Sequence, residues 1–578
     1  MKIHTGSAKV LSTTARSNIS SLLPIIVLAL FGCLYYASYY NYSFNWADEG
    51  SVALISERLA KGERPYIDVE PGYGLLWFYP IAVLFKIFGA SLLVLRIWFI
   101  SVGFAACLIS YALLLRLTHK PLVAFLVAAL VLLFPGSGYR TYIPLLVIAG
   151  AYVLCLYDAR TLRPTVPAWL ALTANGVYLG ITFLIRGDIA TVYSGIFILI
   201  HALAALQAAV RERNALKLLQ FSTRLVGVAI VAVGVGLPFA TQAWSNGYLD
   251  AFLQQYSYFA KAVIPIIQAR FVDLSSVSVG RVADSAGTLL PRASLRSIFW
   301  PGHTQWALLT YAPLMVLIFV GAHIWLDLFR QRSEQPAAVS TRGCNMHLIA
   351  LSLGAFSAFP QFFVFRPDIT HLSEFIPGFI VLCGYLLFMM GKSVGKSAVS
   401  IHVSQVAFYM LSLLCVVYLG AYAALYPDGF NLRRDRTTKL LIEDRLDVYV
   451  NPWEYQVLNE LNTIIRKESR PSDYVLCFPY CPGINFAADR PTLQRVLYVD
   501  DALLVTQPNW IKEMETEIKE KKPRVIVIWN WDINATPISR FSVWAAPLYH
   551  FISETYELRA RIARNDKDQS WYEVYVLK

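Results

Sequence analysis

Long apolar runs separated by short polar links dominate the chain up to about residue 426. A helix needs about 20 apolar residues to cross the hydrocarbon core of a bilayer, and eleven of the runs approach or exceed that length. The pattern predicts a polytopic α-helical membrane protein with about eleven spans, in a range of ten to thirteen. The runs lie near residues 21–40, 91–115, 121–138, 141–157, 168–185, 188–210, 222–244, 306–329, 346–365, 372–390 and 402–426.

A further apolar run, residues 71–89, is expected to behave differently. Its sequence, PGYGLLWFYPIAVLFKIFG, contains two prolines and Lys86, and counting it as a span would scatter the basic links over both sides of the membrane. If this run lies in the interface or enters only part way, every basic link falls on one side, as the positive-inside rule requires. We therefore expect the N-terminus inside and the C-terminus outside, with external loops at residues 41–90 and 245–305.

Charge density rises and apolar runs shorten after residue 427. YVLCF, RVIVIWN and WYEVYVLK have the pattern of strands, whereas PNWIKEMETEIKEKK and ISRFSVWAAPLYHFISETY have helical spacing. Residues 1–426 are thus expected to form a transmembrane domain, and residues 427–578 a small external α/β domain.

Composition agrees with this division. Of the 578 residues, 56% are hydrophobic and only 15% are charged, which excludes an ordinary soluble core for most of the chain. The net charge of +12 comes largely from Lys and Arg in the short links, so it is a topology signal and does not point to nucleic acid.

Cys477 and Cys481, in CFPYC, could form a disulfide in an oxidising compartment or stay reduced, and the sequence leaves both possibilities open.

The first candidate for chemistry is NWADEG, residues 45–50, which follows the first apolar run. Asp48 and Glu49 open the external loop, and the residues after them have the spacing of a short helix on the membrane surface. The acids could simply stabilise the N-terminus of that helix. A carboxylate at this place is also suited to act as general base on an acceptor hydroxyl, if the other reactant arrives in the lipid phase.

A reactant carried by lipid would contain phosphate, which needs basic side chains nearby. Polar clusters of the required kind lie at external ends of predicted spans. Each of these charges could instead be structural, pairing locally or extending to the interface. The candidates are Arg186 and Asp188 in FLIRGDIA, Arg366, Asp368, His371 and Glu374 in FVFRPDITHLSEF, and Lys86 in the partly inserted run.

Together these features resemble the membrane-embedded glycosyltransferases of the GT-C type. The resemblance rests on an uncleaved first span, on the Asp-Glu pair that opens the first external loop, and on the stretch ERLAKGERPYIDVEPGYGLLWFYPIAVLFKIFGASLLVLR. It is clearest over residues 40–210 and only architectural in the external domain. The branches concerned include protein O-mannosyltransferases, aminoarabinose transferases, and galacturonosyltransferases of the rhizobial lipopolysaccharide core.

The resemblance implies that a sugar passes, with inversion, from a polyprenyl-phosphate donor to an envelope glycan, glycolipid or protein. Asp48 matches the loop acid that acts as general base in such enzymes, and Glu49 is the second member of that pair. NWADEG lacks the DxD-like arrangement of the metal-dependent members, so no essential metal is expected. No cofactor is expected beyond the lipid carrier of the sugar.

The same resemblance suggests a role for Lys86, which occupies the place of a basic residue that contacts the donor phosphate in the aminoarabinose branch. The RPDITHL segment has no assigned counterpart in the family, and its role in phosphate binding rests on topology and charge. On that basis Arg366 would stabilise the departing polyprenyl phosphate with help from His371, Arg186 or Lys86, and Asp188 and Asp368 are additional candidates for the site. Such an enzyme would lie in a bacterial inner membrane, with its active site and C-terminal domain on the periplasmic face.

Two other classes of function compete with this hypothesis. A flippase or transporter for lipid-linked glycans should place ionisable groups near the membrane midplane and often shows inverted repeats. Here the polar clusters lie at external ends of spans, and no repeat is evident. A non-catalytic scaffold that binds a partner through its external domain would leave Asp48 dispensable. An O-antigen ligase or polymerase is a neighbouring enzymatic alternative. The sequence identifies neither the sugar nor the acceptor.

Overall fold

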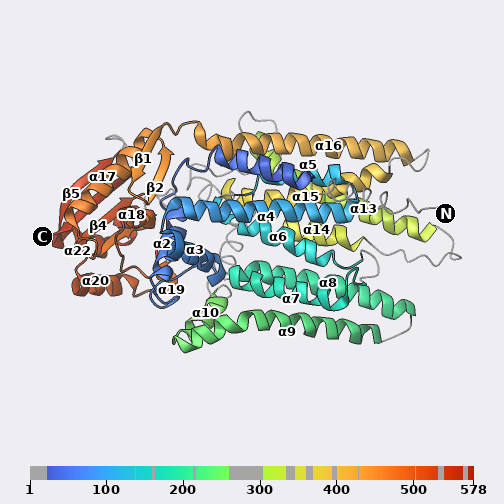
Figure 1. Ribbon diagram of the computed structural model, residues 1–578, viewed down its shortest axis with the longest axis horizontal. Coiled ribbons are helices and arrows are strands. Elements are labelled where there is room, and N and C mark those ends of the chain that lie inside the picture. The colour runs from blue at the N-terminus through green and yellow to red at the C-terminus, as the bar shows by residue number, and fades with distance from the viewer. Residues whose placement is uncertain are drawn as a thin grey trace, which may run out of the picture.

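The structure is a computed structural model in which helices run along the long axis and a sheet lies at one end (Figure 1). The helices come from the first 426 residues, and the sheet comes from the segment that follows. The residues it describes are 23–136, 138–158, 163–212, 216–258, 304–333, 345–359, 369–393, 400–426, 428–500, 503–531, 539–563 and 570–578.

Within these ranges, seven helices are long and apolar enough to cross a membrane, and five shorter apolar helices accompany them. Each of the eleven predicted spans coincides with one of these helices, so the predicted polytopic helical fold is confirmed. The helices that match the predicted spans are Leu23–Ala37, α4 (Leu92–Thr118), α5 (Pro121–Leu133), α6 (Tyr142–Leu154), α7 (Ala168–Ile185), α8 (Gly187–Glu212), α9 (Leu216–Ser245), α13 (Thr304–Ser333), α14 (Met346–Phe356), α15 (Ile369–Ser393) and α16 (Ser400–Leu425).

Two short helices lie at the junction between the bundle and the sheet (Figure 1). They are α2 (Asp48–Ala60), which begins within NWADEG, and α3 (Leu75–Phe88), which comes from the run at residues 71–89. At 1.5 Å per residue α3 is about 21 Å long, whereas the hydrocarbon core is about 30 Å thick. The helices α5, α6 and α14 are shorter still, so length alone does not decide whether this run crosses, and its partial insertion stays a prediction. A third short helix, α10 (Leu249–Tyr258), follows α9.

The bundle has a central helix and a peripheral one. In α15, 78% of the apolar window is buried, compared with 6% in α9. The first turns of α15 nevertheless contain three buried polar side chains, those of His371, Ser373 and Glu374. A buried charge is costly unless it has partners, so the start of α15 must meet polar groups from other elements.

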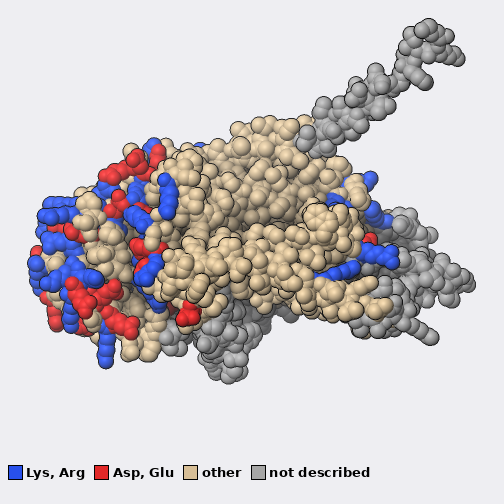
Figure 2. All heavy atoms as spheres, turned by 60° about the horizontal axis from the view of Figure 1, so that its bottom comes forward, with Lys and Arg blue, Asp and Glu red and all other residues tan. Residues whose placement is uncertain are grey.

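Charged side chains gather at the two ends of the molecule, and the helix surfaces between them are almost uncharged (Figure 2). Helix α4 shows the separation directly. It begins beside the sheet-bearing segment, where the Leu92 N–H donates to the carbonyl of Arg445 at 2.9 Å. Its 27 residues carry Arg116 to the opposite end, about 40 Å away. An uncharged belt between charged ends is what a lipid bilayer around the helices requires.

The segment after residue 428 contains a four-stranded sheet of order β3-β4-β6-β5, in which β3 and β4 are parallel and the other pairs antiparallel. A separate antiparallel hairpin, β1–β2, precedes it. The elements are η6 (Gly429–Arg433), β1 (Thr438–Ile442), β2 (Leu446–Val450), α17 (Pro452–Glu468), β3 (Val475–Phe478), α18 (Pro482–Ala488), α19 (Leu503–Thr506), α20 (Trp510–Lys521), β4 (Val525–Asn530), α21 (Phe541–Trp544), α22 (Ala546–Thr555), β5 (Tyr556–Ala563) and β6 (Trp571–Leu577).

The predicted α/β character of this segment is confirmed. YVLCF, RVIVIWN and WYEVYVLK supply β3, β4 and β6, and the two stretches with helical spacing supply α20 and the pair α21 and α22. The sequence pattern did not reveal the hairpin, α17 or β5. Strand β5 alternates weakly because its burial changes irregularly along YELRARIA.

The sheet-bearing segment is docked on the loop that contains NWADEG. The Ser43 N–H donates to the Tyr449 carbonyl, and the Tyr449 N–H donates to the Asn41 carbonyl, both at 2.7 Å. Residues 41–43 thus pair with β2 and add a short third extended segment to the β1–β2 hairpin.

A second docking contact brings two backbones together at glycines. The N–H of Gly483, at the start of α18, donates to the Trp46 carbonyl at 2.7 Å. A Cβ placed on Gly50 would lie 2.3 Å from the Cα of Gly483, and a Cβ on Gly483 would lie 2.6 Å from the Cα of Trp46. The obstructing atoms are backbone, so only glycine fits at either position.

We expect Gly483→Ala to loosen this contact and to destabilise the protein by about 1–3 kcal/mol, the usual cost of overpacking. Thermal unfolding of the purified protein in detergent measures the loss, and limited proteolysis should cut the chain faster after residue 428. Gly234→Ala in α9 is the matched control, because a Cβ there meets nothing within 4 Å. An unchanged midpoint for Gly483→Ala would contradict the contact.

Candidate active site

The carboxylate of Asp48 lies where the bundle meets the sheet-bearing segment. The side chain of Asn45 accepts from the N–H groups of Ala47 and Asp48, at 3.1 and 2.9 Å, and so fixes the turn that starts α2. Asp48 Oδ2 accepts a hydrogen bond from the Tyr139 hydroxyl at 2.6 Å, and Oδ1 accepts one from the Tyr480 hydroxyl at 2.7 Å. Asp48 therefore does more than begin a helix.

Tyr480 comes from the sheet-bearing segment and lies inside CFPYC. Cys477 and Cys481 form a disulfide, which settles the alternative that the sequence left open. Because the disulfide closes a five-residue loop, it restricts where Tyr480 can lie. Burial and the nearby charge of Asp48 raise the pKa of the Tyr480 hydroxyl well above its usual value. The hydroxyl thus keeps its proton and acts as a donor.

Glu49 faces different partners from Asp48. Its two carboxylate oxygens accept from Nε and Nη2 of Arg96, each at 2.8 Å, and both side chains are largely buried. Arg96 also donates to the carbonyls of Tyr40, Tyr42 and Ser43. This bidentate ion pair connects the NWADEG loop to α4, so Glu49 has a structural role. A chemical role for Glu49 stays a prediction.

A chain of hydrogen bonds leads from Asp48 into the bundle. The Tyr139 hydroxyl accepts from Arg140 Nε at 2.9 Å, and Arg140 Nη1 donates to Glu374 Oε1 at 2.6 Å. The same Nη1 lies 3.2 Å from His371 Nε2. Since an arginine N–H only donates, Nε2 of His371 is the acceptor and its ring proton is on Nδ1. The start of α15 thus meets its polar partners through Arg140.

A second buried arginine lies close to this chain. Arg186 pairs with Asp188 at 3.0 Å, and its guanidinium lies 5.6 Å from the centre of the Tyr73 ring. Its charge also interacts with that of Glu374. Arg140, just before α6, and Arg186, at the end of α7, therefore both interact with the carboxylate of Glu374 on α15, the first through an ion pair and the second through its charge.

The sequence candidates fall into three groups. The structure brings together Asp48, Arg186, Asp188 and His371 at one end of the bundle. Lys86 is exposed near the end of α3, beside the exposed side chains of Ile87 and Phe88, and its role in phosphate binding stays a prediction. Arg366 and Asp368 lie outside the described residues.

Sequence reasoning missed several residues of this site. Arg140 falls between two apolar runs in PGSGYRTYIP, without an acid beside it, and Tyr139 precedes it. An arginine at an external end of a span, away from the basic links of the other side, was the available signal. Tyr480 carried a weaker signal, its place between two cysteines. Nothing local pointed to Tyr73 or Arg96.

Within the described ranges, no group of three His, Cys, Asp or Glu side chains is arranged to hold a metal ion. The expectation that no metal is essential stays a prediction.

Because both oxygens of Glu49 are engaged by Arg96, Glu49→Gln should lower the free energy of unfolding by about 3 kcal/mol, the usual cost of breaking a buried ion pair. Asp48→Asn should cost less, because an amide oxygen still accepts one of the tyrosine hydroxyls. Thermal unfolding of the two variants side by side measures the difference. Equal midpoints would show that the ion pair does not hold the loop.

The sequence matches no protein-family model, and no curated protein matches it. The structure is similar to two crystal structures of ArnT from Cupriavidus metallidurans, one bound to undecaprenyl phosphate and one in the apo state. The first comparison covers 95% of this chain and 97% of that chain at 13% identity, and the second covers 97% and 98% at 12%. Both have a TM-score of 0.47. ArnT is an aminoarabinose transferase, one of the branches that the sequence resembles. At this TM-score and identity, the likeness assigns neither an activity nor a site residue to this chain.

Proposed function

We propose that the chain is a membrane glycosyltransferase that moves a sugar from a polyprenyl-phosphate carrier to a hydroxyl of an envelope glycan, glycolipid or protein. One observation supports this proposal above the others. A carboxylate held by two tyrosine hydroxyls lies one side chain away from a cluster of buried arginines, at an end of a helix bundle. A base and an anion-binding group are thus adjacent where a lipid-borne reactant can meet a polar one.

The acceptor has a defined place at Asp48. A carboxylate offers about four acceptor positions. Oδ2 accepts from Tyr139 and, at 3.4 Å, from Asn45, whereas among the described residues Oδ1 accepts only from Tyr480. Oδ1 therefore has room for one more donor, and we assign it to the acceptor hydroxyl. As that hydroxyl gives its proton to Asp48, its oxygen forms the new bond to the anomeric carbon.

The leaving group departs on the opposite face of the anomeric carbon. The bond from that carbon to the phosphate oxygen breaks, its electron pair stays on the polyprenyl phosphate, and the single displacement inverts the anomeric centre. Arg140 is suited to receive this charge. Nε and Nη1 are engaged, but among the described residues no partner occupies Nη2. Arg186, His371, Arg366 and Lys86 are proposed to assist.

Tyr139 keeps the base and the cation apart. A direct pair between Asp48 and Arg140 would neutralise the carboxylate that must accept a proton. The phenol between them accepts from one and donates to the other, so both remain in place without meeting. We place this site on the periplasmic face of a bacterial inner membrane.

The test is transfer of radiolabelled sugar from a panel of polyprenyl-phosphate sugars, with envelope fractions as acceptor. Removing a general base typically slows a reaction by a factor of about 10² to 10⁴, so Asp48→Asn should lose nearly all transfer. Asp447→Asn, an exposed acid on β2 that pairs with Lys439, is the matched control. Equal transfer by Asp48→Asn and the parent at matched expression would remove Asp48 from the chemistry. No transfer by the parent with any donor would contradict the proposed reaction.

A second prediction concerns the disulfide. Without it, Tyr480 loses part of its restraint, and misplacement of a group that orients a catalytic residue is costly. Cys477→Ser with Cys481→Ser should lower kcat about ten-fold, and Tyr480→Phe, which keeps the ring, should do so without loss of fold. Cys33→Ser, at an exposed free cysteine, is the control. Parental rates in both site variants would show that the external segment does not act on Asp48.

A further inference from the structure

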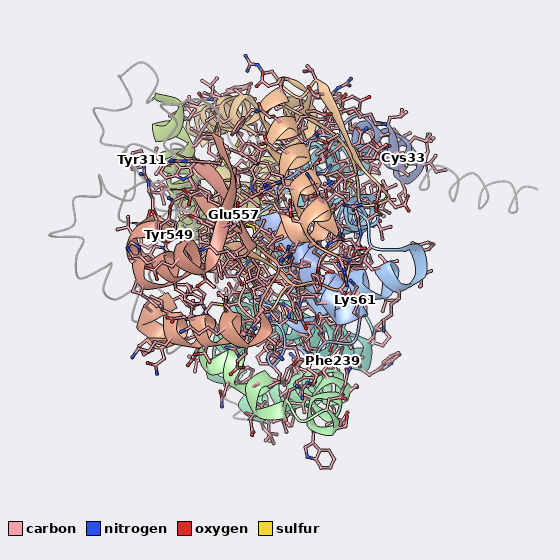
Figure 3. The ribbon with its side chains drawn as sticks, turned by 90° about the vertical axis from the view of Figure 1, so that its left-hand side faces the viewer. Cys33, Lys61, Phe239, Tyr311, Tyr549 and Glu557 are labelled. Atoms are coloured by element: carbon pink, nitrogen blue, oxygen red, sulfur yellow. A yellow bond between two sulfur atoms is a disulfide. The ribbon has the colours of Figure 1, made fainter. Side chains whose placement is uncertain are left out.

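A large polar cleft lies between the loop after α2 and the sheet-bearing segment, at the opposite end of α2 from Asp48. Its volume is about 640 Å³, within the range of ligand-binding pockets. One wall includes Arg58 at the end of α2 with Glu63 and Asp68 after it. The other includes Tyr474 and the face of α20 that bears Glu513 and Glu517. Figure 3 views this end of the molecule, with Lys61 marking the end of α2.

Hydrogen bonds and an ion pair connect the residues at the floor of the cleft. Arg58 donates from Nη1 to the Gln494 carbonyl at 2.6 Å and from Nη2 to the Asp68 carbonyl at 2.7 Å, and its Nε pairs with Glu63. The Glu70 N–H donates to the Arg495 carbonyl at 2.8 Å. The bonds from Arg58 to Gln494 and from Glu70 to Arg495 join the two halves of the chain, so the cleft is a preformed feature.

Two acids on α20 present carboxylates to the cleft. Glu513 and Glu517 are four residues apart and so lie on one helix face, where like charges destabilise a helix. Neither carboxylate accepts a hydrogen bond from a described residue, and burial raises the pKa of the Glu517 carboxyl. By contrast, Glu515 on the same helix pairs with Lys519. Two carboxylates thus line the cleft with open acceptor positions, and the charges of Lys521 and Arg58 partly offset that of Glu517.

The charge of the lining indicates the kind of ligand. Four carboxylates and two arginines line the cleft, and both arginines already donate to backbone carbonyls. Such a surface repels phosphate, which argues against the lipid-linked donor. Its open carboxylate acceptors, with the partly exposed ring of Tyr474, suit a ligand rich in hydroxyl groups.

We infer that this cleft binds the saccharide of the acceptor, in uncharged or amino-bearing units. The inference rests on the proposed function for the identity of the acceptor. Arg58 follows Asp48 by ten residues in one helix, a distance of about 15 Å along α2. An oligosaccharide whose reacting hydroxyl lies at Asp48 can therefore extend into the cleft, which would select acceptors by the sugars beyond the one that reacts.

The test measures binding rather than turnover. Chitosan oligosaccharides, which bear amino groups, and malto-oligosaccharides, which are uncharged, are titrated into the purified full-length protein in nanodiscs and followed by calorimetry. The double variant Glu513→Gln with Glu517→Gln should raise Kd about ten-fold, as expected for lost hydrogen bonds to charged groups. The matched control, Glu515→Gln with Glu520→Gln, removes the same charge from the same helix outside the cleft and should change Kd less than about two-fold.

Three results would overturn the inference: no saturable binding to the parent protein, unchanged binding in the cleft variant, or equal loss in the two double variants, which would indicate a general charge effect. Asp48→Asn separates this inference from the proposed function. If the cleft is the acceptor site, that variant still binds the saccharide although it transfers no sugar. In transfer assays the cleft variant should raise KM for the acceptor and leave KM for the donor unchanged.

Discussion

Two tyrosine hydroxyls from opposite halves of the chain meet on the carboxylate of Asp48. Tyr139 approaches from the bundle and Tyr480 from the sheet-bearing segment. Each hydrogen bond is short, and each needs its partner within a fraction of an ångström. Three surrounding contacts restrict the positions of these partners. The disulfide restrains Tyr480, and the close contact of Gly50 with Gly483 fixes the packing of α18 on α2. Arg96 holds the NWADEG loop through its ion pair with Glu49.

The bundle side of the site contains buried charged side chains, and the geometry brings charges of opposite sign together. Arginines and carboxylates are buried there together, and a buried charge without a partner is strongly destabilising. Glu374 pairs with Arg140 and also interacts with the charge of Arg186, and Asp188 pairs with Arg186. One carboxylate oxygen, Oε2 of Glu374, is buried and accepts no hydrogen bond from a described residue. Such a cost is typical of functional sites, where polar groups are arranged for a ligand or for water.

Much of the fold could be predicted because the membrane imposes strict rules. Spans must be apolar and about 20 residues long, so the eleven apolar runs that form helices could be found in the sequence, and Pro80 and Lys86 distinguished the run at residues 71–89 from them. Asp48 could be found for a similar reason, since an acid next to a span is unusual. Tyr139 and Tyr480 could not, because tyrosine is common at membrane interfaces and only tertiary packing brings these two together. Arg96 was hidden in the same way, at the start of an apolar run.

The hydrogen bond between Asp48 and Tyr480 also has a consequence for the biogenesis of the protein. The two residues are 432 positions apart, so the ribosome makes the carboxylate long before its second hydroxyl partner. Every later span has to insert, and the sheet-bearing segment has to fold and form its disulfide, before the pair can form. A truncated or half-made chain therefore exposes an acid without the tyrosine that orients it. Biogenesis itself keeps the site incomplete until the whole polypeptide has reached its final place.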